Sequence, residues 1–217
     1  MTTVTVIGAG NFGSVVAGVA AKGGTGIQVL ARDPEKAHAV AGPLGGTAGT
    51  IGDEVTGDVV VLAVPYGAVT DVLNAYSGAF DGKIVVDVTN PVDFSTFDDL
   101  VVPADSSAAR VLQDAVPGAK VVKAFNTNFG GTLATGGVGS GEVGTGEVGT
   151  VPTTVLVAGD DAAAKQTLVD LVTAAGLRGV DAGSLKRARE LEAVGLLQMT
   201  LAGAEKISWS GGLALVS

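Results

Sequence analysis

The stretch VIGAGNFGSVV, residues 6–16, decides the fold of this chain. Its glycines at 8, 10 and 13 form the pattern G-x-G-x-x-G. The pattern follows an apolar run at 4–7, typical of a strand, and opens an amphipathic stretch at 11–21, typical of a helix. A second apolar run at 27–30 completes a strand–helix–strand unit of about 30 residues. In this context the glycine pattern indicates a dinucleotide-binding unit rather than an ordinary tight turn.

Each glycine of the pattern has its own physical role. Gly8 allows the tight turn, Gly10 lets the backbone approach a pyrophosphate, and Gly13 lets the helix pack closely on the sheet. The free amides of Asn11, Phe12 and Gly13 are expected at the positive end of the helix dipole, where anions bind. The motif therefore predicts a pyrophosphate site.

Short apolar runs alternate with helical stretches along the rest of the chain, which predicts an α/β fold. We expect a Rossmann-type, doubly wound and mostly parallel sheet over residues 1–183, and a short C-terminal helical extension over 184–217. Ligands of such sheets bind at the carboxyl ends of the strands. The expected further strands are 59–64, 83–88, 120–125, 153–157 and a short edge strand at 177–180; the expected further helices are 34–40 (capped by Asp33), 69–75, 107–115, 161–175 (capped by Asp160) and 185–206 (capped by Ser184).

Residues 130–150 are rich in glycine and repeat GEVGT in tandem at 141–145 and 146–150. Such a composition predicts a flexible surface loop. A mobile lid is the alternative, because the segment leaves the carboxyl end of a predicted strand. The segment lacks the Gly-Lys-Ser/Thr ending of a P-loop, so a nucleoside triphosphate site is not expected.

Composition excludes several classes of function. The 217 residues carry a formal net charge of −9, which argues against binding to nucleic acid or to an anionic membrane surface. There is no cysteine, so thiolate catalysis and cysteine-ligated metals are excluded, and His38 is the only histidine. MTTVTVIG at the N-terminus lacks a basic region, and no apolar run reaches about 18 residues. We therefore expect a cytoplasmic protein without a membrane span or a metal site.

The stretch ARDPEK, residues 31–36, follows the second strand, where the cofactor is selected. Ala31 stands where an NAD enzyme carries an acidic ribose ligand. Arg32 can pair with a 2′-phosphate, and Lys36 adds a second positive charge one turn later. Asp33 could serve as the ribose acceptor of an NAD enzyme, but Pro34 after it favours a helix cap. We therefore predict NADP(H) rather than NAD(H).

The nicotinamide is expected over the carboxyl ends of the strands, beside the segments 64–66, 89–91 and 125–128. Pro65 and Pro91 end their strands there and can either face the ring or act only as structural stops. Apolar side chains in these segments can face the ring, and backbone groups can bind its carboxamide.

Few side chains could donate a proton at this end of the cofactor. His38 is expected at the surface of the adenine-side helix, and Lys123 lies inside a strand with no evident carboxylate partner. Tyr66 is the best remaining donor, though it can also serve only in packing. We expect no second substrate domain, so the acceptor should bind at the sheet edge. A flavin or deazaflavin ring fits, since it needs no protein acid, and we assign no catalytic residue.

The combination of VIGAGNFG, ARDPEKA, DVVVLAVPY, KIVVDVTNP, GAKVVKAFNT, VLVAGDD and VDAGSLKRARELE resembles the NADPH-dependent coenzyme F420 reductases over roughly residues 3–205. The resemblance implies hydride transfer between NADPH and the deazaflavin F420 in a homo-oligomer, expected as a dimer. It also places Ala9 to Phe12 at the pyrophosphate, Arg32 and Lys36 at the 2′-phosphate, and Val64, Asn90 and the segment 126–130 near the nicotinamide. The complete set of expected cofactor residues is Gly8, Ala9, Gly10, Asn11, Phe12, Gly13, Arg32, Lys36, Val64, Pro65, Asn90, Pro91, Asn126 and Gly130.

The chain departs from that family's pattern mainly around the acceptor. Ala31 replaces a Ser or Thr of many members, and Asn126 stands where some have histidine. The glycine repeat and the tail ISWSGGLALVS at 207–217 are also unlike theirs. KAFNT resembles in addition the reductase domain of the STEAP metalloreductases, which passes hydride to a flavin. Three functions therefore stay open: an NADPH:F420 oxidoreductase, an NADPH-dependent reductase of flavin or another small acceptor, and a redox-sensing binding module.

The last predicted helix shows an apolar stripe at helical spacing. Leu191, Val194, Leu197 and Leu201 can pack on the chain's own sheet or form a dimer face. The basic residues near the start of this helix are expected in solvent rather than at a ligand: Lys186, Arg187 and Arg189.

Overall fold

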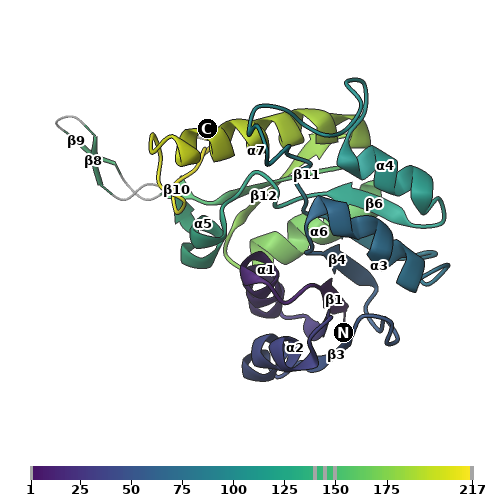
Figure 1. The fold of residues 1–217 in the computed structure, drawn as a ribbon. Coiled ribbons are helices and arrows are strands. Elements are labelled where there is room, and N and C mark those ends of the chain that lie inside the picture. The colour runs from purple at the N-terminus through teal and green to yellow at the C-terminus, as the bar shows by residue number, and fades with distance from the viewer. Residues whose placement is uncertain (1, 139–140, 144–145, 149–150, 216–217) are drawn as a thin grey trace.

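The computed structural model describes residues 2–138, 141–143, 146–148 and 151–215. Its centre is an eight-stranded sheet in the order β12-β11-β6-β5-β4-β1-β2-β3 (Figure 1). Neighbouring strands run parallel except β11, which is antiparallel to β6. The expected Rossmann-type, mostly parallel sheet is confirmed. The strands are β1 Thr3–Ile7, β2 Gly26–Ala31, β3 Thr47–Thr50, β4 Val59–Leu62, β5 Ile84–Asp87, β6 Lys120–Lys123, β11 Thr154–Gly159 and β12 Arg178–Gly183.

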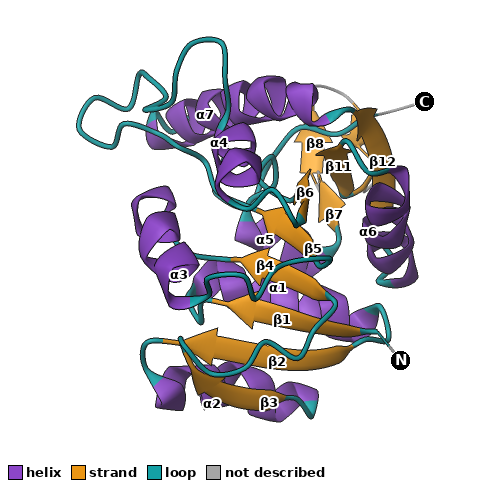
Figure 2. Ribbon diagram, turned by 90° about the vertical axis from the view of Figure 1, so that its right-hand side faces the viewer, coloured by secondary structure: helices purple, strands orange, loops and turns teal. Residues whose placement is uncertain are grey.

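Helices cover both faces of the sheet, as Figure 2 shows. One buried apolar cluster holds side chains of α1, α2, α5 and α6, and a second holds those of α3, α4 and the start of α7. The strands between these two layers are apolar on both faces, as in β4, where all four residues are buried. The helices are α1 Asn11–Lys22, α2 Pro34–Ala41, α3 Val69–Ala75, α4 Ala108–Ala115, α5 Gly130–Thr135, α6 Ala162–Ala174 and α7 Ala188–Gly203.

Two of the expected helix caps are wrong. Asp161 caps α6 by accepting from the amide of Ala164 at 2.8 Å, whereas Asp160 accepts from the amide of Leu185 at 2.9 Å. Ser184 makes no side-chain cap, since a 3₁₀ turn over Leu185–Arg187 precedes α7. The strand β3 was not expected, because TAGT carries no apolar run and lies half-exposed at the sheet edge.

The glycine-rich segment 130–150 holds more regular structure than a loop. It begins with α5, and β7 Gly137–Val138 pairs antiparallel with β10 Val151–Pro152. The repeat forms an antiparallel pair, β8 Gly141–Val143 with β9 Gly146–Val148. The prediction of a loop is therefore wrong for these residues, and positions 139–140, 144–145 and 149–150 lie outside the described residues. Flexibility and a lid role stay predictions.

Within the described part of the chain, no helix combines the length and apolar character needed to span a membrane.

Candidate functional site

The glycine turn between β1 and α1 has the geometry that its sequence predicts. Gly8 has a φ of +120°, and a Cβ there would collide with the carbonyl oxygen of Ala63. A Cβ on Gly13 would collide with the carbonyl oxygen of Gly8, so α1 packs against the turn itself. Gly10 differs, because a Cβ there would meet no atom within 4 Å. The first and third glycines are therefore required by the fold, whereas the second leaves space for a ligand.

The N-terminus of α1 opens at this turn. Gly10 provides no side-chain cap, and its carbonyl accepts the first helical hydrogen bond from the amide of Ser14 at 2.9 Å. The amides of Asn11, Phe12 and Gly13 come before that bond and lack an acceptor within the helix. With the dipole of α1 these amides form a site that favours an anion.

Two cavities meet at this turn. One encloses about 440 Å³, and its lining includes the turn at Gly8 and the side chains of Arg32 and Lys36. The other encloses about 420 Å³, and its lining includes Trp209. They lie at the carboxyl ends of the central strands, where Rossmann-type sheets bind their ligands. The two cavities form one trough, because they share part of their lining: Gly10, Asn11, Ala63, Val64 and Pro65.

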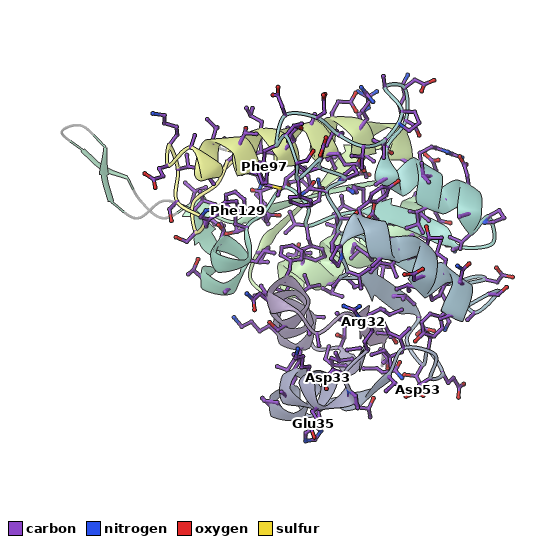
Figure 3. The ribbon with its side chains drawn as sticks, in the orientation of Figure 1. Arg32, Asp33, Glu35, Asp53, Phe97 and Phe129 are labelled. Carbon is purple, nitrogen blue, oxygen red and sulfur yellow. The ribbon has the colours of Figure 1, made fainter. Side chains whose placement is uncertain are left out.

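The end of the trough beside α2 is basic. Asp33 caps α2 by accepting from the amides of Glu35 at 3.0 Å and Lys36 at 3.4 Å, so its expected role as a cap is confirmed. The Nζ of Lys36 lies 3.9 Å from the Asp33 carboxylate. Among the described residues, the guanidinium of Arg32 has no carboxylate within ion-pair distance. Figure 3 shows Arg32 and Asp33 near α2 and Phe129 toward α7.

The other end of the trough is walled by amides and apolar side chains. The Asn126 Nδ2 donates to the Asn90 Oδ1 and to the carbonyl of Leu191, both at 2.9 Å, and the Asn90 Nδ2 donates back to the Asn126 carbonyl at 2.9 Å. These bonds join the loops after β5 and β6 to α7. Three buried polar atoms of lining residues have no hydrogen-bond partner among the described residues: Thr89 Oγ1, Asn126 Oδ1 and Asn128 Oδ1. A bound carboxamide could satisfy such groups.

Tyr66 is the only titratable side chain among the described residues that line this end. Burial raises the pKa of its phenol, and the carboxylates of Glu192 and Asp87 raise it further. The phenol is therefore protonated at neutral pH. His38 is exposed on α2, as expected, and lies outside both cavities.

A buried ion cluster lies beneath the apolar end. The Nζ of Lys123 lies 2.9 Å from the Asp87 Oδ2 and 2.9 Å from the Glu192 Oε1, and it also donates to the carbonyl of Thr89. Glu192 accepts in addition from the amides of Ala108 and Ala109 at the start of α4. The expectation that Lys123 lacks a carboxylate partner is thus wrong. Burial raises the pKa of Glu192, and Lys123 opposes that shift.

The trough contains every expected cofactor residue except Pro91. Pro91 is buried outside both cavities, and its carbonyl accepts from the amide of Val101 at 2.7 Å. Pro91 therefore does not face the trough, and since β5 already ends at Asp87 it does not end that strand either. Sequence reasoning did not identify Phe94, Met199 and Trp209 as lining residues. The unusual composition of the tail at 207–217 was the only signal that pointed there.

Of the basic residues around the start of α7, Arg187 and Arg189 are only partly exposed, and Lys186 and Arg189 line a further cavity. Arg187 pairs with Glu190 at 2.8 Å, Arg189 donates to the carbonyls of Pro103 and Ser106, and Lys186 is exposed. The expected apolar stripe of α7 does not face one way, since Leu191 is buried whereas Leu197 is 54% exposed. The face of α7 that packs inward carries two polar side chains, Glu192 and Gln198.

Comparisons with known proteins find similarity to several oxidoreductases. Residues 3–91 match the family model described as NADP oxidoreductase coenzyme F420-dependent. An F420-dependent NADP reductase of Methanocaldococcus jannaschii is 30% identical over 142 residues, which are 64% of this chain and 59% of that relative. The metalloreductase STEAP3 of Rattus norvegicus is 28% identical over 194 residues, 89% of this chain and 36% of that protein. The chain thus spans less than two thirds of either relative.

Solved structures share the fold over nearly the whole chain. A crystal structure described as a candidate F420-dependent NADP-reductase from Arthrobacter sp. FB24 has a TM-score of 0.80 and 26% identity, with 99% of this chain and 100% of that chain covered. An imine reductase from Myxococcus stipitatus in complex with NADP+ has a TM-score of 0.65 and 20% identity over 94% of this chain and 64% of that chain, which shows the fold alone. The expected family resemblance is confirmed.

Proposed function

We propose that this chain, whose residues 3–91 match the model of the F420-dependent NADP oxidoreductases, transfers hydride between NADP(H) and the deazaflavin coenzyme F420. One observation carries the proposal. A single trough runs along the carboxyl ends of the strands, with a basic end at Arg32, an anion site at the N-terminus of α1, and an apolar end near Asn90 and Asn126. Its three parts correspond to a 2′-phosphate, a pyrophosphate and a nicotinamide.

The residues of the trough suit this cofactor. The amides of Asn11 to Gly13 would hold the pyrophosphate, where Gly10 leaves space. Arg32 and Lys36 would hold the 2′-phosphate. Asn126 would orient the carboxamide through its Oδ1, which has no partner among the described residues, and Asn90 would hold the Asn126 side chain in place. NADPH supplies one hydride, which is two electrons and a proton; the acceptor takes it up together with one proton, leaving NADP+.

No protein acid or base is required in this proposal. Tyr66 is the only titratable group in the described lining of the apolar end, and its raised pKa keeps it protonated. We propose that solvent provides the proton and that the chain contributes position and exclusion of water. The trough would then accelerate the transfer by holding the two reactants close together.

The acceptor can be tested with one assay. NADPH and enzyme should bleach the absorbance of oxidised F420, because the proposed transfer reduces the deazaflavin. A parallel cuvette contains FMN instead of F420. Turnover of F420 supports the proposal, whereas NADPH consumption with FMN alone would replace it with the flavin reductase. Tight NADPH binding without turnover of either acceptor would favour a binding module and contradict both enzyme functions.

Arg32→Ala should weaken NADPH binding about tenfold, because a charge-assisted hydrogen bond to the 2′-phosphate is lost. The affinity for NADH, which lacks that phosphate, should stay unchanged. Calorimetric titration of both nucleotides measures the effect. Arg187→Ala removes the same charge outside both cavities and serves as the control. Unchanged NADPH affinity in Arg32→Ala would contradict the assignment of NADP(H).

The flavin reductase is the second candidate function, because the aromatic side chains at the apolar end suit any planar ring.

The homodimer that the resemblance implies also stays a prediction. Leu197 and Leu213 are more than half exposed and offer apolar surface for it. Light scattering would test the oligomeric state.

A further inference from the structure

The C-terminal tail forms one wall of the apolar end of the trough. After α7, three hydrogen bonds fix the described tail residues. The Thr132 Oγ1 donates to the carbonyl of Gly211, the amide of Leu213 donates to the Gln198 Oε1 at 3.1 Å, and Arg178 donates to the carbonyl of Leu215 at 2.8 Å. The tail therefore has a defined path over α5 and beside α7.

Close packing against α5 supports the same path. A Cβ on Gly131 would lie 3.0 Å from the Cβ of Ser210, so the absence of a side chain at 131 lets the tail approach. Trp209 precedes Ser210, and its ring centroid lies 5.1 Å from that of Phe129. The indole is thus held at the rim of the trough by a neighbouring aromatic ring.

Phe94 and Trp209 are large apolar side chains that line the trough and yet face solvent. Trp209 is 53% exposed and Phe94 is 65% exposed. Phe94 lies in the loop between β5 and α4, and its ring contacts Phe97 edge-on at 5.6 Å. Exposed aromatic side chains that gather around one cavity are typical of a ligand-binding surface. Met199 of α7 adds a polarizable side chain to the same lining.

The chemistry of this end selects a class of ligand. Its described lining carries no charged side chain, and Tyr66 is its one titratable group. Flat, apolar aromatic faces favour a planar ring that stacks on them, and they offer little to a small aliphatic carbonyl compound. Stacking on such side chains tolerates differences in ring substituents.

We propose that Trp209 and Phe94 form the binding subsite for the fused ring of the acceptor, so that the C-terminal tail determines acceptor specificity. The identification of the ring ligand as the acceptor rests on the proposed function. The binding itself does not, and it can be measured without turnover. The ring class is that of flavins and deazaflavins.

The test compares Trp209→Ala, Trp209→Phe and Phe94→Ala with the unchanged chain. Each protein is saturated with NADP+, which cannot donate hydride, and is titrated calorimetrically with F420, FMN and cyclohexanone. We expect Trp209→Ala and Phe94→Ala to weaken binding of a ring ligand about tenfold, and Trp209→Phe to restore most of it. Thermal unfolding of each variant shows that the fold is retained.

A second readout comes from the protein itself. Trp209 is the only tryptophan of the chain, so its fluorescence reports on this subsite alone. A ring that stacks there should quench the emission in a saturable manner, at the same concentrations that the calorimetric titration gives. Cyclohexanone should cause neither heat nor saturable quenching.

The outcomes separate this inference from the proposed function. If ring ligands bind the Trp209→Ala and Phe94→Ala variants as tightly as the unchanged chain, or if cyclohexanone binds in place of a ring, the subsite is wrong even where NADPH reduces F420. If a ring binds through Trp209 but NADPH reduces no acceptor, the subsite stands and the proposed function fails. Preference for F420 or for FMN in the titrations identifies which ring the subsite takes.

Discussion

Replacing Lys123 with methionine should lower the free energy of unfolding by about 3–5 kcal/mol. The ammonium group is fully buried and contacts the carboxylates of Asp87 and Glu192, both at 2.9 Å. Methionine fills a similar volume but leaves these two carboxylates buried together without a cation, and the carbonyl of Thr89 loses its donor. Urea denaturation measures the change.

Lys120→Met on the same strand is the matched control. Lys120 pairs with Asp161 at 3.4 Å, but both side chains are partly exposed. Solvent screens such a pair, so we expect a loss of less than about 1 kcal/mol. Equal effects of the two substitutions would contradict the claim that the buried cluster stabilises the fold.

This cluster also shows what the sequence could predict and what it could not. Asp87 and Lys123 end adjacent strands, and the register pairs them directly. That pairing depends on the strand order, which a single chain's pattern does not give. Glu192 was missed for another reason, because the expected apolar stripe of α7 gave no sign that polar side chains are buried on this helix. The buried face carries Glu192 and Gln198 beside Leu191, and the partners of both polar side chains lie far away in the sequence.

Sequence patterns that depend on neighbouring residues predicted the structure better than contacts between distant segments could be predicted. The glycine pattern, the Asp33 cap and the apolar runs predicted the first half of the sheet, since each depends on neighbours within a few residues. The edge strand β3 was missed because its residues have no apolar pattern. Trp209 could not be placed in the trough, because the packing of the tail on Gly131 and its hydrogen bonds to distant residues bring it there. Contacts between distant segments thus account for most of what was missed at the site.

Gly10→Ala should weaken NADPH binding by about 10- to 100-fold while the fold is retained. Gly10 has an extended backbone that alanine can adopt, and its Cβ would project into open space within the trough. The methyl group would therefore occupy space that the proposed pyrophosphate needs, and steric conflict of about 1–3 kcal/mol corresponds to a loss of up to about 100-fold. The change at a helix cap should cost about 1 kcal/mol or less of stability.

Gly13→Ala provides the matched comparison, because it adds the same methyl group three residues later, at a position without open space. Its Cβ would collide with the carbonyl of Gly8, so α1 must shift away from the turn and the free energy of unfolding should fall by more than in Gly10→Ala. Calorimetric titration with NADPH and urea denaturation of both variants separate the two effects. If Gly10→Ala binds NADPH as tightly as the unchanged chain, the pyrophosphate does not lie at this turn, and the proposed function loses its central observation.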